Sequence, residues 1–305
     1  MKHFLFLLST TVFILLACAN SSIISEGCRS GIYLWYNSII PVILPFMLIS
    51  AIILERISTY NINTNTAVST ALIIGLMCGF PTGTIVISHF YKKGILKRNT
   101  AQCMLSVCNN VSPMFLYAYI YRGYLSLDYT MAFVALYIYI PQLIYMLTAL
   151  SLQKLLPDIF GYRKRRISSY SVEGEAACCN NEKGSEGSKD SLLTGIVTNI
   201  SIIGIYIVIF SIITMLIQNY LKGTFWSIIA AYMEISKGIP ILFELSLDGK
   251  IKTALILSLT SFGGLSALFQ SRELIKESRL SFIRYIADKL ICSILSYTAV
   301  LLFIH

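Results

Sequence analysis

The fold is decided by residues 67–91, AVSTALIIGLMCGFPTGTIVISHFY, in which two apolar arms flank the cluster GFPTG at positions 79–83. Glycine and proline together interrupt a helix, so this run does not predict one continuous helix. Each arm of about a dozen residues spans only ~18 Å at 1.5 Å per residue, about half of a bilayer core. The stretch therefore predicts a re-entrant helical hairpin whose tip lies near the membrane midplane, with one kinked crossing helix as the alternative.

The composition of the whole chain is that of a membrane protein. Of the 305 residues, 56% are hydrophobic and 13% are charged, whereas soluble domains carry roughly 25% charged residues. The mean hydropathy of +0.72 and the repeated apolar runs, each near the ~20 residues of a crossing helix, argue against a water-soluble enzyme. We attribute the net charge of +9 to basic cytoplasmic loops and not to nucleic-acid binding, because positive loops resist translocation. The partner that this composition predicts is the lipid bilayer.

A second interrupted span covers residues 100–121 and breaks at NNVSP, positions 109–113. Serine followed by proline suits the cap and first position of a helix, so a new half-helix is expected to begin at Ser112. Residues 129–152 predict an ordinary crossing helix. Residues 153–190 then hold 13 of the chain's 39 charged residues and predict a flexible, charged cytoplasmic loop.

The second half of the chain echoes the first. It predicts helices over 192–216 and 282–304, and two short arms, 252–261 and 265–274, around Phe262–Gly263–Gly264. Placing Gly79 on Gly263 aligns the two predicted hairpins at a constant offset of 184, which indicates an internal duplication. The segment 225–245, which carries Glu234, shows lower contrast in hydropathy than the predicted crossing helices and is compatible with an interfacial helix.

These patterns predict an all-α polytopic membrane protein with about six transmembrane helices and two re-entrant helical hairpins in a duplicated, inverted arrangement. The chain divides into an N-terminal transmembrane helix with a short loop (1–30), a first repeat (31–152), the charged loop (153–190) and a second repeat (191–305). If 225–245 lies on the surface, the hairpins enter from opposite sides. Five basic residues would then lie outside, against the positive-inside tendency, and we favour the repeat over that tendency. They are Lys250, Lys252, Arg272, Lys276 and Arg279.

The interrupted segments also predict a solute site. Backbone groups left unpaired at a helix break are costly in lipid, so such breaks persist only where protein buries them or where they line a polar cavity. Exposed half-helix N-termini also favour an anion. A dicarboxylate or a nucleoside would suit amide and hydroxyl side chains at these breaks; in the alternative, Asn109 and Asn110 only cap helix ends. The candidate substrate-binding residues are Thr82, Asn109, Asn110, Ser112, Gly263, Gly264, Ser266 and Gln270.

Charged groups in the apolar segments are few, and catalytic patterns are missing. Glu234 is a candidate for carrying a coupling proton or binding a cation; alternatively, it is solvated at the membrane surface. Arg284 could pair with a substrate carboxylate, or form an ordinary helix pair with Asp288 four residues later. The sequence has no enzyme or metal-binding motif, and histidine occurs only at positions 3, 89 and 305. We therefore expect a non-enzyme without metal or cofactor.

Three stretches carry a family resemblance: GIYLWYNSIIPVILPFMLIS (31–50), GFPTGTIVISHFYKKGILKRNTAQCMLSVCNNVSPMF (79–115) and SFGGLSALFQ (261–270). Together they resemble the YlbJ-type sporulation integral membrane proteins, which contain the nucleoside-recognition or Gate domain. The similarity covers about residues 30–125 and 190–300, so that both repeats are Gate-like. The chain departs from the expected pattern at Phe80, where a tyrosine is expected, and at Thr82, where another small residue is expected.

The resemblance implies a membrane protein of endospore-forming bacteria that is expressed during sporulation and lies in the outer forespore membrane. Members of this group are associated with passage of dipicolinic acid towards the forespore, and Gate domains are similar to parts of concentrative nucleoside transporters. The expected function is a permease that moves a small anionic or nucleoside-like metabolite, dipicolinic acid first, by alternating access. Such transport would be passive, coupled to an ion or driven by a partner. A membrane scaffold for spore maturation, in which the polar breaks are structural, is the alternative.

Overall fold

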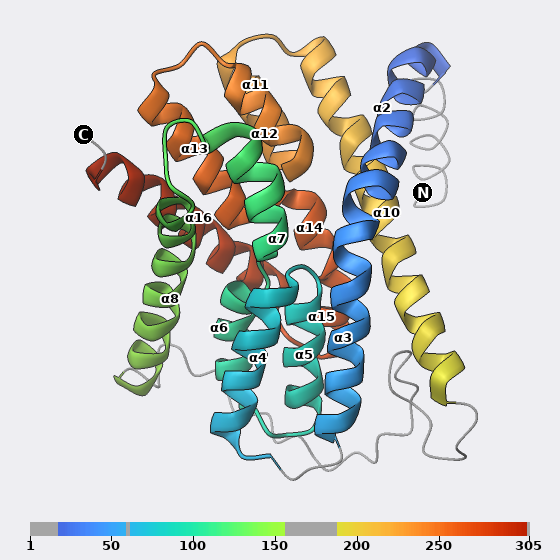
Figure 1. Cartoon of the computed structure of the whole chain (residues 1–305), viewed down its shortest axis with the longest axis vertical. Helices are drawn as coiled ribbons and strands as arrows, with labels where there is room; N and C mark the ends of the chain where they lie inside the picture. Colours follow the sequence, from blue (N-terminus) through green and yellow to red (C-terminus); the bar gives the residue numbers. More distant parts are fainter. Residues whose placement is uncertain (1–17, 59–61, 156–187, 304–305) are drawn as a thin grey trace, which may run out of the picture.

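The computed structural model describes residues 18–58, 62–155 and 188–303, and within these ranges every regular element is a helix (Figure 1). This confirms the all-helical prediction for the described residues. Five helices there are long and apolar enough to cross a membrane. They cover Ser21–Ile57, Met131–Leu152, Thr194–Tyr220, Gly249–Gln270 and Phe282–Phe303. Most of the predicted N-terminal helix (1–17) and of the predicted charged loop (156–187) lies outside the described residues.

The first half begins with one long helix. α2 (Ser21–Leu34), the π-helical turn η1 (Trp35–Ile39) and α3 (Ile40–Ser58) follow one another directly, so this helix begins within the predicted N-terminal segment (1–30) and not at the start of the predicted first repeat. Pro41 has no N–H for the carbonyl four residues before it, and a π-turn is one way for a helix to accommodate such a gap. The helix packs along α10 (Ser188–Tyr220).

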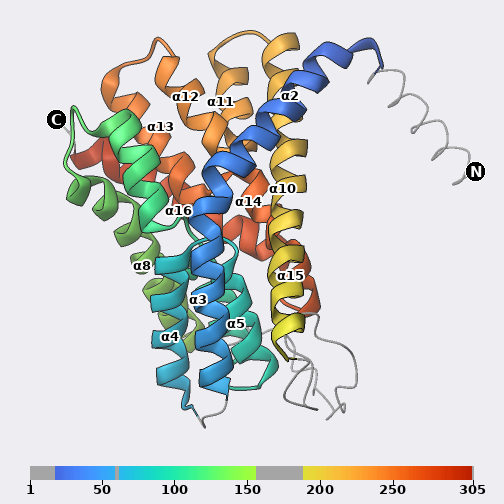
Figure 2. The same cartoon turned by 45° about the vertical axis from the view of Figure 1, so that its right-hand side comes forward.

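The predicted hairpin at 79–83 is present as two helices that lie side by side, α4 (Thr64–Cys78) and α5 (Thr82–Lys92) (Figures 1 and 2). Asn63 caps α4, because its side chain accepts a hydrogen bond from the N–H of Thr66 at 2.8 Å. Gly79 ends α4 with φ +78°, a conformation that favours glycine. The chain then reverses over Phe80 and Pro81.

The second interrupted span continues in one direction through its break. α6 (Arg98–Cys108) ends at Asn109, and α7 (Pro113–Phe115) and the π-helix η2 (Leu116–Leu125) follow. Ser112 caps the new helix by accepting from the N–H of Phe115 at 3.2 Å, and Pro113 occupies its first turn. The predicted start at Ser112 is therefore confirmed. α8 (Met131–Leu155) completes the first half.

The segment 225–245 was wrongly predicted as one interfacial helix. It forms a second hairpin, because α11 (Thr224–Met233) and α12 (Ile235–Glu244) lie side by side and Glu234 makes the turn between them in an extended conformation. The two arms approach closely at Gly238, where a Cβ would lie 2.1 Å from the carbonyl oxygen of Ala231. A larger residue at this position would push the arms apart.

The predicted hairpin at Gly263–Gly264 was also wrong. α13 (Gly249–Phe262), α14 (Gly264–Gln270) and α15 (Arg272–Glu277) succeed one another without folding back, so the two glycines bend one continuing span. Gly263 is the left-handed residue that ends α13, with φ +92°, a conformation that commonly terminates helices and favours glycine. α16 (Phe282–Phe303) follows.

The duplication therefore has a different alignment from the predicted one. Each half contains a long helix, a hairpin, a bent span and a final helix. The bent spans begin at Arg98 and Gly249 and the final helices at Met131 and Phe282, and both pairs are 151 residues apart, not 184. In Figure 1 the α4–α5 hairpin lies at the lower end and the α11–α12 hairpin at the upper end, so the two hairpins approach each other from opposite ends.

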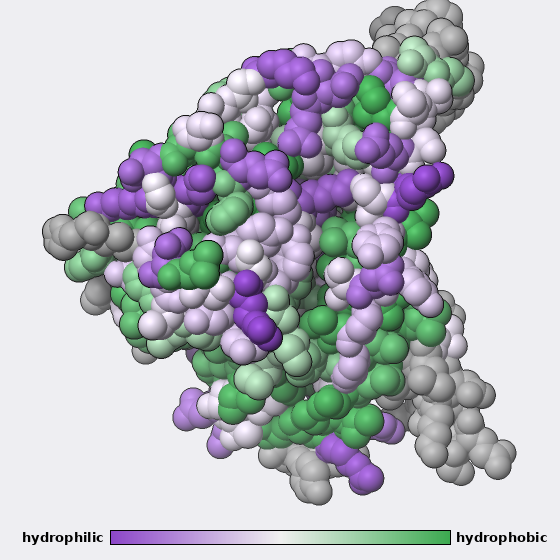
Figure 3. Space-filling model, turned by 45° about the horizontal axis from the view of Figure 1, so that its top comes forward, coloured by the Kyte–Doolittle hydropathy of each residue, from purple (hydrophilic) through white to green (hydrophobic). Residues whose placement is uncertain are grey.

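The corrected alignment removes the conflict between the repeat and the positive-inside tendency for the basic residues after the second bend, whereas Lys250 and Lys252 lie at the start of α13, beside the α11–α12 hairpin. Lys92 pairs with Glu277 (Nζ to Oε2 3.3 Å), and Arg98 donates from Nη2 to the carbonyl of Arg279 at 3.2 Å. The basic residues after the second bend therefore lie at the same end as those after the first hairpin. Figure 3 shows hydrophilic residues gathered at the opposite end and hydrophobic residues over the flank below it.

The bent span α13–α14 lies at the centre, with 83% of an 18-residue apolar stretch within it buried, and the flanking helices turn large apolar side chains outward. Ile73, Leu147 and Ile294, for example, are 64%, 60% and 60% exposed. An apolar exterior around a centre that holds the bends is the arrangement that a lipid environment favours.

Candidate functional site

The four helix breaks meet at the centre of the molecule. A Cβ on Gly263 would lie 2.4 Å from Cζ of Phe80, so the second bend touches the first hairpin turn. A Cβ on Gly264 would lie 2.9 Å from the backbone nitrogen of Ile235, so the same bend touches the second hairpin turn. The N–H of Phe80 donates to the carbonyl of Asn110 at 2.8 Å, which joins the first hairpin turn to the first bend.

A pocket of about 60 Å³ opens beside this junction. Its walls come from the first long helix, from α10, and from the residues around all four breaks. Its polar lining is Ser38, Ser112, Glu234, Ser266 and Gln270. Its apolar lining is Ile39, Val42, Ile43, Cys78, Phe80, Val111, Phe115, Ile203, Ile207, Ile235 and Ala267. The volume holds a few water molecules, at ~10–15 Å³ each, and is well below the 300–1,000 Å³ of typical ligand sites.

Three of the eight predicted substrate-binding residues line the pocket: Ser112, Ser266 and Gln270. Ser266 and Gln270 lie on successive turns of α14, and Nε2 of Gln270 donates to Oγ of Ser266 at 3.2 Å. Gly263 and Gly264 make the close contacts of the junction and do not line the pocket. Thr82 is fully buried outside the pocket.

Glu234 also lines the pocket, and its alternative placement at a solvated membrane surface was wrong. Its side chain is 2% exposed because the turn between α11 and α12 points into the centre of the molecule. One carboxylate oxygen caps α12 by accepting from the N–H of Lys237 at 2.8 Å. No lysine, arginine or histidine lines the pocket in the described part of the chain, so Glu234 is its only ionisable lining side chain apart from Cys78.

The side chains of Asn109 and Asn110 form hydrogen bonds with other protein groups and do not line the pocket. Nδ2 of Asn109 donates to Oγ of Ser271 at 2.7 Å and to the hydroxyl of Tyr285 at 2.6 Å. Nδ2 of Asn110 donates to the carbonyl of Val107 at 2.7 Å and to Oε1 of Gln142. The predicted helix-capping alternative thus describes Asn110, which binds a carbonyl at the end of α6, but not Asn109, whose amide joins the first bend to the second half.

Two residues of this central network were missed at the level of sequence. Lys289 on α16 is fully buried, and its ammonium donates to Oδ1 of Asn110 at 2.7 Å and to the carbonyl of Asn109 at 3.2 Å. Gln142 on α8 donates from Nε2 to Oγ of Ser261 at 2.9 Å, at the end of α13. Each final helix thus serves the bent span of the other half. A lysine inside an apolar crossing segment was a signal in the sequence, whereas nothing distinguished Gln142.

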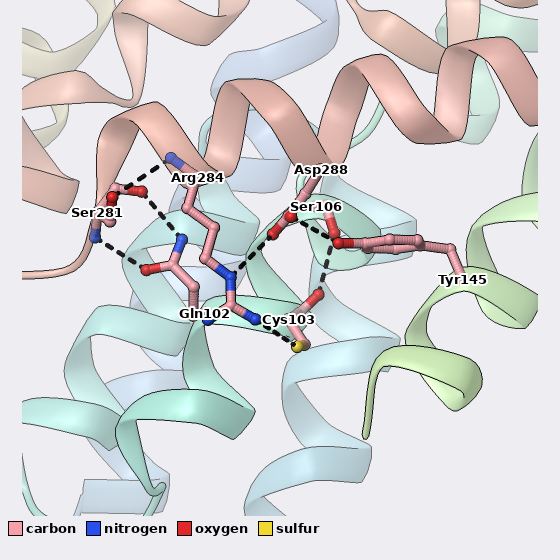
Figure 4. Close-up of polar contacts among 7 residues, drawn as sticks. All are labelled: Gln102, Cys103, Ser106, Tyr145, Ser281, Arg284 and Asp288. Carbon is pink, nitrogen blue, oxygen red and sulfur yellow. Dashed lines mark hydrogen bonds and ion pairs between the residues drawn. The ribbon is translucent and has the colours of Figure 1, made fainter. Parts of the chain in front are cut away.

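Arg284 lies in a separate polar cluster between α16, α6 and α8 (Figure 4). Its Nε is 3.8 Å from Oδ2 of Asp288, and its Nη2 lies 3.5 Å from Sγ of Cys103. The hydroxyl of Tyr145 donates to the other oxygen of Asp288 at 2.5 Å. Arg284 therefore forms an ordinary ion pair with Asp288 one helical turn later, which was the predicted alternative to pairing with a substrate carboxylate. It does not line the pocket.

Within the described ranges, no group of three or more histidine, cysteine, aspartate or glutamate side chains is placed to hold a metal ion. What the site offers chemically is a small set of hydroxyl and amide groups and one carboxylate, set among isoleucine and phenylalanine side chains. No family model, curated protein or solved structure matches the chain.

Proposed function

We propose that this protein is a membrane permease and that the pocket at the meeting point of the four helix breaks holds its solute. One observation carries the proposal: two hairpins from opposite ends and two bent spans direct their non-helical turns at one small, mainly apolar pocket that contains hydroxyl, amide and carboxylate groups. Helix breaks in lipid require such burial or such a cavity. The same arrangement of repeats around a central site is common in secondary transporters.

In the membrane, the two hairpins would be re-entrant. At 1.5 Å per residue, the 15 residues of α4 and the 10 residues of α11 reach only ~22 Å and ~15 Å, short of the ~30 Å hydrocarbon core. The long helices and the two bent spans would cross fully. The end that carries Lys92, Arg98 and Arg279 would face the cytoplasm, because basic loops resist translocation.

The lining of the pocket constrains the solute. Hydroxyl and amide groups next to Phe80 and Phe115 suit a small ring compound with several hydrogen-bonding atoms, such as a nucleoside or dipicolinic acid. A carboxylate solute would be repelled by an ionised Glu234, so an anion would enter together with a proton on Glu234. By resemblance, dipicolinic acid during sporulation is the first solute to test, and the outer forespore membrane is the location to test by imaging a fluorescent fusion.

Transport requires the pocket to widen, since its present volume is below that of either solute class. Movement of the two halves around the junction, opening the pocket to one end and then to the other, would give alternating access. The rival function is a membrane scaffold for spore maturation. It is favoured by the network of Asn109, Asn110, Gln142 and Lys289, in which polar side chains at the breaks bind other protein groups.

The test is uptake of labelled dipicolinate and nucleosides into proteoliposomes. We expect Ser266→Ala and Gln270→Ala to weaken solute binding by about 2- to 10-fold each, the effect of one lost neutral hydrogen bond. Ser296→Ala is the matched control, because Ser296 is fully buried outside the pocket. Absence of uptake of any of these solutes by well-folded protein would favour the scaffold, and equal losses in all three variants would discard the pocket as the site.

A further inference from the structure

Lys289 is a fully buried lysine that forms no salt bridge with any residue in the described ranges. The neighbouring carboxylate of Asp288 is engaged by Tyr145 and Arg284 on another side of α16. An uncompensated ammonium in a low-dielectric interior is strongly unfavourable. A protonated Lys289 therefore requires other groups that stabilise its charge.

The stabilising groups are three oxygens at the end of α6 and one aromatic ring. Nζ of Lys289 lies 2.7 Å from Oδ1 of Asn110, 3.2 Å from the carbonyl oxygen of Asn109 and 3.4 Å from that of Ser106. The C-terminal end of a helix carries partial negative charge. The ring of Phe80, at the first hairpin turn, lies 5.3 Å from the ammonium, within the range of a cation–π contact.

These ligands are the kind that hold a free monovalent cation. Neutral carbonyl and amide oxygens at the C-terminal end of a broken membrane helix coordinate monovalent ions in transporters, whereas Ca²⁺ sites depend on carboxylates. Here the cation is covalently attached to a helix of the second half, while its ligands all belong to the first half.

We propose that the end of α6 is a monovalent-cation site and that the ammonium of Lys289 is its resident cation. The protein then needs no free Na⁺ or K⁺ to hold the first bend and the first hairpin turn together. Removing the lysine side chain would leave a vacant oxygen site that a free cation can enter. For the proposed permease, and resting on that function, this means solute uptake without sodium coupling at this site.

The test compares the thermal unfolding of purified Lys289→Ala in NaCl, KCl, NH₄Cl, methylammonium chloride and choline chloride at equal ionic strength. Choline is too large for the site and serves as the reference ion. We expect at least one small cation to stabilise Lys289→Ala saturably; at ten times the dissociation constant, the folding equilibrium constant would rise about elevenfold. Lys289→Met is the matched control, since it fills the same space without charge and is expected not to respond.

Three outcomes would overturn the proposal. One is a Lys289→Ala protein that none of the small cations stabilises more than choline does. A second is a Lys289→Met protein that responds as strongly as Lys289→Ala does. The third is measured on the unaltered protein, so it does not depend on a variant that folds. It is specific stabilisation of this protein by Na⁺ or K⁺, or solute uptake that occurs in Na⁺ but not when choline replaces Na⁺.

The unfolding measurement does not depend on transport. Specific rescue of Lys289→Ala without uptake of any solute would support the cation site and count against the permease. Solute uptake without stabilisation of Lys289→Ala by any small cation would support the permease and count against the cation site.

Discussion

The contact between Gly263 and Phe80 gives the sharpest test of how the breaks meet. We predict that Gly263→Ala destabilises the protein by about 2–5 kcal/mol. Two effects add up to this range. Gly263 has φ +92°, and a left-handed conformation costs an L-residue roughly 1–2 kcal/mol. The new Cβ would also lie 2.4 Å from Cζ of Phe80, and overpacking of this kind costs about 1–3 kcal/mol.

Two other glycines separate these effects. Gly94 has φ +73° and nothing within 4 Å of the position that a Cβ would take, so Gly94→Ala should show only the conformational cost of about 1–2 kcal/mol. Gly249 has neither constraint, and its replacement by alanine in a helix should be neutral or stabilising by up to ~1 kcal/mol. A third variant, Phe80→Ala with Gly263→Ala, should recover the steric part of the loss, because it removes the ring that the Cβ meets.

The assay is equilibrium unfolding of the purified proteins in mixed micelles, with the free energy of unfolding compared across the variants. The reasoning would be refuted if Gly263→Ala were no more destabilising than Gly94→Ala. It would also be refuted if removing the Phe80 ring recovered nothing, because the bend would then not touch the hairpin turn.

Three further predictions follow from the site and the topology. Glu234→Gln keeps an oxygen that can cap α12, so stability should change by less than about 1 kcal/mol; uptake of an anionic solute should lose its increase at low pH, and retained pH dependence would exclude Glu234 as the proton carrier. Asn109→Ala leaves two buried hydroxyls without their amide partner and should cost about 2–5 kcal/mol, while the solute affinity of the folded fraction, measured by equilibrium binding, stays unchanged; weaker binding there would return Asn109 to the solute site. In a background without native cysteines, Lys276→Cys should be labelled by a membrane-impermeant reagent from the cytoplasmic side and Lys222→Cys from the opposite side; labelling of both from one side would contradict the bent span between them.

The sequence predicted those features that rest on local chemistry. Glycine and proline at 79–83 interrupt a helix wherever they occur, and serine before proline at 112–113 caps one, so both breaks were predictable. The turn at Glu234 was not, because one extended residue between two helices carries no glycine or proline. At 263–264 the two glycines indicated a break, but whether the chain bends or reverses there depends on packing against Phe80 and Ile235.

The composition of the site was predictable only in part for a related reason. Ser112, Ser266 and Gln270 were identified as polar residues near breaks, and the rotation of each helix decides which of these face the pocket. Asn109 and Asn110 have the same chemistry but lie on the side of the break that faces α8 and α16. Gln142 on α8 follows Asn110 by 32 residues and Lys289 on α16 by 179, so these contacts with the break cannot be deduced from local sequence.

The amide of Gln142 has a mechanical consequence. It accepts from Asn110 in one half of the chain and donates to Ser261 in the other. A displacement that separates the two bends must break one of these two hydrogen bonds, together with those that join Asn109 to Ser271 and Lys289 to Asn110. Gln142 therefore adds a latch between the two halves, since it cannot keep both of its bonds once the bends part.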